Sequence, residues 1–141
     1  MDVNKLLKAL DDESNDQLFN LTTKKILEMN LQILKELELD RNETLELLKK
    51  LKEYKYVDEM SDLKYDTYIR WIPINNPNTI ILKKGAVFCE MKITDDGVFL
   101  VCKNYGYSSK HFQIQMDTNL IFQKLTTQEQ ILLSALDHLA K

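Results

Sequence analysis

The residues best suited to catalysis or metal binding in this 141-residue chain are two histidines and two cysteines. His111 borders a predicted strand, His138 lies in a predicted C-terminal helix, and Cys89 and Cys102 fall in two neighbouring predicted strands. Nucleophilic catalysis needs a Ser or Cys beside a His and an orienting acid, and the chain has no Gly-x-Ser-x-Gly elbow. A metal site would need the thiols to converge on His111, and nothing in their spacing brings them together.

Other catalytic signatures are also missing from the sequence. Three glycines in the whole chain leave no Gly-rich loop of the kind that holds phosphate groups. Asp95 and Asp96 are paired carboxylates, but Thr94-Asp95-Asp96-Gly97 is typical of a tight turn between strands. The sequence therefore predicts a protein that is not an enzyme and that carries neither a cofactor nor a metal.

Aromatic residues interleaved with cations are the remaining candidates for a binding site. Small barrels bind peptides or single-stranded nucleic acid by stacking on such side chains, with nearby charges following the backbone. The candidate partner-binding residues are Tyr68, Arg70 and Trp71 in one predicted strand, and Tyr105, Tyr107 and Lys110 near a later one.

Strand alternation separates these candidates. Tyr68 and Arg70 are expected on one face of their strand, and Ile69 and Trp71 on the other. Trp71 is therefore expected in the core, and Arg70 is the stronger candidate for binding. The alternative for Arg70 is an ion pair with a carboxylate such as Glu90.

Composition and charge limit the class of protein. The content of 44% hydrophobic and 29% charged residues is ordinary for a soluble globular domain. Residues 63–125 carry eight Lys and Arg against five Asp and Glu, an excess too small to indicate a nucleic-acid surface. No apolar run approaches the ~18 residues of a membrane span, and no signal peptide is evident. We expect an intracellular protein with reduced thiols.

The first 62 residues form a predicted helical segment. Residues 4–10 have the spacing of a short amphipathic helix, and residues 18–39 carry two adjacent apolar stripes with Asn30 at an inward position. Asp40, three residues before Glu43, resembles the cap of a further helix that runs to about Tyr54. A helical hairpin is favoured over a coiled coil with Asn30 setting its register, because too few heptads are present.

Residues 63–125 are predicted to form a small, mostly antiparallel β-barrel of SH3-like or OB-like type. The expected strands are residues 68–72, 79–82, 86–93, 98–102, 112–115 and 120–122. A four-residue loop between the third and fourth strands would place Cys89 opposite Cys102, and a shorter loop would slide them apart. Residues 126–141 are expected to form a C-terminal helix on the same domain, opened by the capping box Thr126-Thr127-Gln128-Glu129. The predicted class is α+β.

Three short aromatic signatures carry a resemblance to a known family: Tyr56-Val57-Asp58-Glu59, Tyr68-Ile69-Arg70-Trp71-Ile72 and Ile121-Phe122-Gln123-Lys124-Leu125. Over about residues 54–125 the chain resembles small uncharacterised proteins of nucleocytoplasmic large DNA viruses, the mimivirus-like giants in particular. The excess of Lys over Arg, seventeen to two, fits the AT-rich genome expected there. The resemblance implies a viral protein of the host cytoplasm (the virus factory) or the virion, and it transfers no activity to any residue.

Taken together, the sequence predicts a non-catalytic protein-interaction module or complex subunit. It would bind a protein partner, or itself, through the small barrel, the apolar helices or both. The apolar excess of residues 18–39 motivates this, because a helix with two apolar stripes needs more than one covering surface. The alternative is a small barrel that binds nucleic acid; no membrane contact is expected.

Overall fold

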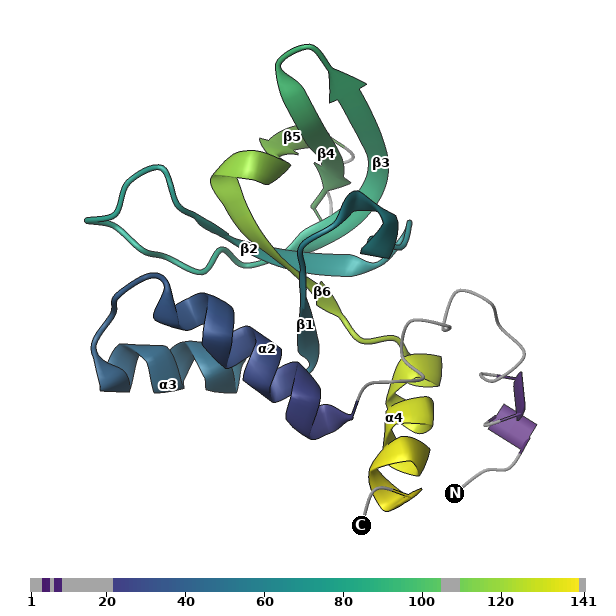
Figure 1. Cartoon of the computed structure of the whole chain (residues 1–141). Coiled ribbons are helices and arrows are strands. Elements are labelled where there is room, and N and C mark those ends of the chain that lie inside the picture. The colour runs from purple at the N-terminus through teal and green to yellow at the C-terminus, as the bar shows by residue number, and fades with distance from the viewer. Residues whose placement is uncertain (1–3, 6, 9–21, 105–109, 140–141) are drawn as a thin grey trace. The chain divides into compact units, whose positions relative to one another are not determined.

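The computed structural model describes residues 4–5, 7–8, 22–104 and 110–139, and it divides the chain into two compact units (Figure 1). One unit contains residues 1–48 and 125–141, and the other contains residues 49–124. We call them the helical unit and the sheet unit and describe each by itself.

Three helices belong wholly or mostly to the helical unit: α2 (Thr23–Lys35), α3 (Arg41–Lys50, whose last turn reaches the sheet unit) and α4 (Thr127–Leu139). Helices α2 and α4 bury a shared apolar cluster: Ile26, Leu125, Leu132 and Leu133, with Leu136 beside them. At one end of this pair the Asp137 carboxylate accepts hydrogen bonds from the Thr23 amide and hydroxyl, at 2.9 and 2.5 Å.

Two predicted helix starts are confirmed, at Asp40 and Thr126. The helix predicted over residues 18–39 instead begins at Thr23, where the Thr22 hydroxyl accepts the Lys25 amide at 3.2 Å, and ends at Lys35. The Asp40 carboxylate accepts the Glu43 amide at 2.8 Å. Thr126 and Glu129 form the reciprocal capping box, because each backbone amide donates to the other's side chain at 3.0 and 3.1 Å. Asn30 is buried as predicted. Residues 18–21 and most of the predicted helix at 4–10 lie outside the described residues.

The sheet unit contains six antiparallel strands in the order β1-β6-β2-β3-β4-β5. They are β1 (Tyr54–Val57), β2 (Tyr68–Pro73), β3 (Ala86–Thr94), β4 (Gly97–Lys103), β5 (His111–Gln115) and β6 (Asn119–Lys124). In the described residues β1 and β5 do not pair, so the sheet is open and not hydrogen-bonded into a closed barrel. The α+β class, the antiparallel sheet and the C-terminal helix agree with the sequence prediction.

Two strand assignments differ from the sequence prediction. Residues 79–82 were predicted to form a strand but have no regular structure; only the next residue bonds toward β2, through the Lys83 amide and the Trp71 carbonyl at 2.8 Å. Just before this segment the chain makes a local turn, in which the Asn76 side chain accepts the Asn78 amide at 3.1 Å. In contrast, Tyr54–Val57, which is not among the strands expected from sequence, is an edge strand paired with β6.

A bulge in β3 sets the register of the longest hairpin. Thr94 pairs with Gly97 and Glu90 pairs with Val101, but the next pair is Phe88 with Cys102, so Cys89 is the extra residue. Cys89 therefore does not sit opposite Cys102. At the bulge the alternation of side chains along β3 is shifted by one residue. Phe88 and Met91 therefore lie on the core side of the sheet, and Cys89 does not. Figure 1 shows β3 as a long curved strand, as a bulge would produce.

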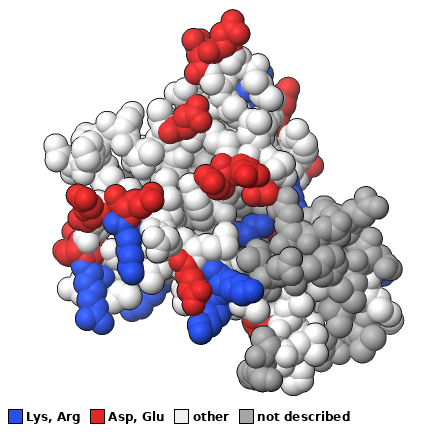
Figure 2. All heavy atoms as spheres, viewed as in Figure 1, with Lys and Arg blue, Asp and Glu red and all other residues white. Residues whose placement is uncertain are grey.

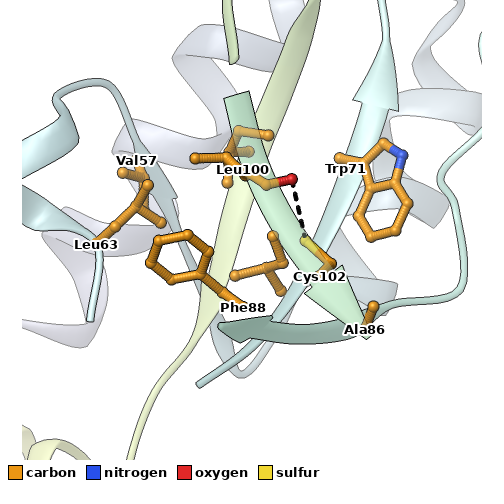
Figure 3. Close-up of a cluster of buried hydrophobic side chains, with 9 residues drawn as sticks. Val57, Leu63, Trp71, Ala86, Phe88, Leu100 and Cys102 are labelled. Atoms are coloured by element: carbon orange, nitrogen blue, oxygen red, sulfur yellow. Dashed lines mark hydrogen bonds between the residues drawn. The ribbon is translucent and has the colours of Figure 1, made fainter. Parts of the chain in front are cut away.

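The core of the sheet unit lies on one side of these strands (Figure 3). Its buried members come from β1, β2, β3, β4 and β6 and from the chain between β1 and β2: Val57, Leu63, Ile69, Trp71, Ala86, Phe88, Leu100, Cys102 and Ile121. No helix among the described residues is long and apolar enough to span a membrane.

Candidate functional site

The sheet unit has a pocket of about 670 Å³ at one end of its sheet. We call it the end pocket. The lining comes from the end of β1, the turn after it, the residue after β2, the start of β4, the turn between β5 and β6, and the start of β6: Tyr56, Val57, Asp58, Glu59, Met60, Ser61, Ile74, Val98, Met116, Asp117, Asn119 and Leu120. All of these residues belong to one unit, so the pocket does not depend on the helical unit.

Hydrogen bonds hold the walls of the end pocket in place. The Ile74 amide donates to the Thr118 carbonyl at 3.0 Å, which joins the chain after β2 to the 3-10 turn Met116–Thr118. The Asn119 side-chain amide closes that turn by donating to the Gln115 carbonyl at 2.7 Å. Opposite, Met60–Asp62 is a second 3-10 turn, bonded from the Asp62 amide to the Glu59 carbonyl at 3.0 Å.

A buried glutamine fixes the segment that follows this second turn. Gln123 of β6 is only 1% exposed, and its Oε1 accepts the Lys64 amide at 2.7 Å and the Thr67 hydroxyl at 3.2 Å. Its Nε2 donates to the Asp62 carbonyl at 3.4 Å. One side chain thus ties the chain between β1 and β2 to the sheet, which holds the pocket wall at Met60 and Ser61.

The floor of the end pocket is apolar and partly open to water. Val57 and Leu120 are buried beneath it, and Met116 and Val98 pack against the core cluster while remaining half-buried. Met60 and Ile74 are 40% and 37% exposed, which is high for large apolar side chains.

The rim of the end pocket is acidic. Asp58, Glu59 and Asp117 are exposed, and among the described residues no Lys or Arg lines the pocket. None of these three carboxylates has a hydrogen bond or ion pair within the described part of the chain. The Asp117 carboxylate lies against Gly97, where an added methyl group would come within 3.1 Å of its oxygen. Figure 2 shows further acidic side chains gathered at the tip of the β3–β4 hairpin, which leads into the pocket wall at Val98.

The described residues among those proposed from sequence do not line the end pocket. Trp71 is 9% exposed and packs in the core, its ring 5.8 Å from that of Phe112, as the strand alternation predicted. Tyr68 and Arg70 lie on the opposite face of β2 and are half-buried. The structure therefore does not bring Trp71 together with the other two as one stacking surface.

Arg70 has a structural contact, and it is not the ion pair with Glu90 considered from sequence. Its Nε donates to the Lys83 carbonyl at 3.0 Å, so it fastens the returning loop alongside β2. Arg70 also lies close to Tyr54: burial raises the pKa of Tyr54, and the guanidinium partly offsets that rise. Tyr105 and Tyr107 lie outside the described residues, and Lys110 is exposed and does not line the end pocket.

The cysteines are free thiols in different environments. Cys102 is fully buried, and burial raises its pKa to about 12. Its Sγ lies 3.8 Å from the Leu100 carbonyl, the contact drawn in Figure 3. Across the described residues, no group of three or more His, Cys, Asp or Glu could hold a metal ion.

The end pocket could not be found by the motif search applied to the sequence. Its residues come from five separate short segments, and none of them matches a catalytic or ligand-binding motif. Among the lining residues, Tyr56-Val57-Asp58-Glu59 also carries part of the family resemblance. Comparison of the chain with protein-family models, curated proteins and solved structures finds no match.

Proposed function

We propose that this protein is a non-catalytic interaction module, or a subunit of a larger complex, that binds a segment of a partner protein in the end pocket. The observation that carries the proposal is a pocket of about 670 Å³ whose apolar residues Met60 and Ile74 remain open to water. Natural ligand sites have this size, with an apolar lining and a few polar groups. Covering exposed apolar surface is favourable, and methionine adapts its shape to different partners.

We also propose that β2 to β6, although their sheet is open, have the strand arrangement of an SH3-like small barrel. In that fold the first strand pairs with the last, the other strands follow as a meander, and a 3-10 turn precedes the last strand. The order β6-β2-β3-β4-β5 and the turn Met116–Thr118 support this type over the OB-like one. Strand β1 would then be an addition at the β6 edge. Interstrand NOEs linking β2 to both β6 and β3 would test the order.

Selection of peptides from a random library displayed on phage, on the immobilised full chain, tests the binding function. We expect enriched peptides to bind the wild type, and Met60→Ser/Ile74→Ser to bind them about tenfold more weakly because apolar contact is lost. Ile81→Ser is the matched control, since Ile81 is 51% exposed and lies outside the pocket. The proposal is overturned if no peptide is enriched, or if both variants bind like the wild type.

A viral origin, with residence in the host cytoplasm or the virion, is a further proposal that rests on the sequence resemblance alone. Mass spectrometry of purified virions and of infected-cell fractions would test it. Detection of the chain in neither fraction would count against it.

A further inference from the structure

We propose that the partner segment bound in the end pocket carries a lysine or arginine flanked by apolar side chains. This inference rests on the proposed function and adds the chemistry of the ligand. It comes from the combination of an apolar floor with a rim that carries charge of one sign only.

The rim charge is local and is not a property of the whole unit. Residues 49–124 contain twelve Lys and Arg against nine Asp and Glu, so the sheet unit is positive overall. The described lining of the end pocket nevertheless has three carboxylates and no cation. In a unit with an excess of cations, a pocket without any is a specific arrangement of side chains.

The three carboxylates are also available to a ligand. Asp58, Glu59 and Asp117 have no hydrogen-bond or ion-pair partner in the described residues, and two different walls of the pocket provide them. Asp58 and Glu59 follow β1, and Asp117 lies in the turn before β6. A cation entering between these walls would meet carboxylates from both sides. Opposite charges attract more strongly where water is partly excluded.

The apolar floor of the pocket determines which side chains flank the cation in the ligand. Met60, Ile74 and Val98 offer apolar contact around the acidic rim. Tyr56 is the single aromatic residue among the described lining residues, which therefore do not form an aromatic groove of the kind that binds proline-rich segments. Phosphate groups would be repelled by the rim, which argues against nucleic acid at this site. A segment that alternates cationic and apolar side chains satisfies both the rim and the floor.

Two synthetic peptides and two protein variants test the inference. The first peptide is the best-enriched library sequence, and the second is its copy with every Lys and Arg replaced by Gln. By fluorescence anisotropy, we expect the neutral copy to bind about tenfold more weakly. Asp58→Asn/Glu59→Gln/Asp117→Asn should weaken binding of the charged peptide to a similar degree, and raising NaCl should weaken it further.

The control variant is Glu46→Gln/Glu53→Gln/Glu90→Gln, which removes the same net charge at exposed positions outside the pocket and should leave binding within twofold of the wild type.

If both peptides bind equally and Met60→Ser/Ile74→Ser still weakens them, the charge inference fails and the proposed function stands. If no peptide binds the pocket, both fail. If the chain forms an oligomer and the pocket variants do not, the occupant of the pocket is a second copy of the chain. That result would overturn the assignment to a partner protein.

Discussion

At the scale of single residues, Gly85 is the position where the fold leaves no room for a side chain. A methyl group there would lie 2.7 Å from the Ile69 carbonyl oxygen and 2.8 Å from Cζ of the Tyr68 ring. The ring can move but the strand carbonyl cannot. We expect Gly85→Ala to lower the free energy of unfolding by about 1–3 kcal/mol in urea titrations. Adding Tyr68→Ala should not restore it; a full recovery would show that the ring alone sets the limit.

Gln123 provides a second prediction at this scale. Replacing it with Leu leaves the Lys64 amide and the Asp62 carbonyl without their partner in a buried place. We expect Gln123→Leu to cost about 1–3 kcal/mol of stability, because buried polar groups that lose their hydrogen bonds are costly. Gln113→Leu is the matched control, since Gln113 is exposed on β5, and it should change stability by less than about 0.5 kcal/mol. Equal losses in the two variants would contradict the role of the buried amide.

Cys102 makes stability depend on pH in the alkaline range. Its pKa is about 12 in the fold and 9.0 for an ordinary thiol, so the folded chain holds its proton where the unfolded chain releases it. The contribution is fully present below about pH 9 and is lost as pH rises toward 12, with a slope of up to about 1.4 kcal/mol per pH unit. The stability difference between wild type and Cys102→Ala should therefore shrink above pH 9. Cys89→Ala should retain most of the wild-type slope, because burial is the larger cause of the raised pKa of Cys102 and the charge of Cys89 is the smaller one.

At the scale of elements, the start of α4 depends on two reciprocal bonds. Thr126→Ala removes the hydroxyl that accepts the Glu129 amide, whereas the bond from the Thr126 backbone amide to the Glu129 carboxylate stays in place. We expect a loss of about 1 kcal/mol, as for other helix caps, measured by thermal or urea unfolding. Thr127→Ala, at an exposed position one residue further on, should be close to neutral. A neutral Thr126→Ala would mean that the capping box contributes nothing to stability.

The elements also show how far sequence reasoning reaches. Local signals succeeded: the Asp-Asp-Gly turn after Thr94, the two helix caps and the Ile69–Trp71 alternation each depend on neighbours in the chain. The bulge at Cys89 was missed because alternation continues smoothly through it, and only pairing with β4 reveals the shift. The apolar run at residues 79–82 has the composition of a strand but no partner strand. The end pocket was missed because its walls meet only after folding.

At the scale of the whole molecule, the division into two units predicts that the sheet unit can fold alone. Every residue of its core cluster and of the end pocket lies within residues 49–124. We expect this fragment to give a dispersed amide spectrum and a cooperative urea transition, with lower stability than the full chain because small units bury less surface. If the fragment shows the circular-dichroism spectrum of a β-sheet without helix but has no cooperative unfolding transition, the sheet requires the rest of the chain.

The helical unit has a different dependence on chain order. Its apolar cluster joins Ile26, made early, to Leu132 and Leu133, which leave the ribosome only after all six strands have been synthesised. During translation the sheet can therefore form first, while the apolar side of α2 remains uncovered. Stalled nascent chains that end before residue 125 should accordingly recruit holding chaperones at α2, and chains extended past α4 should release them.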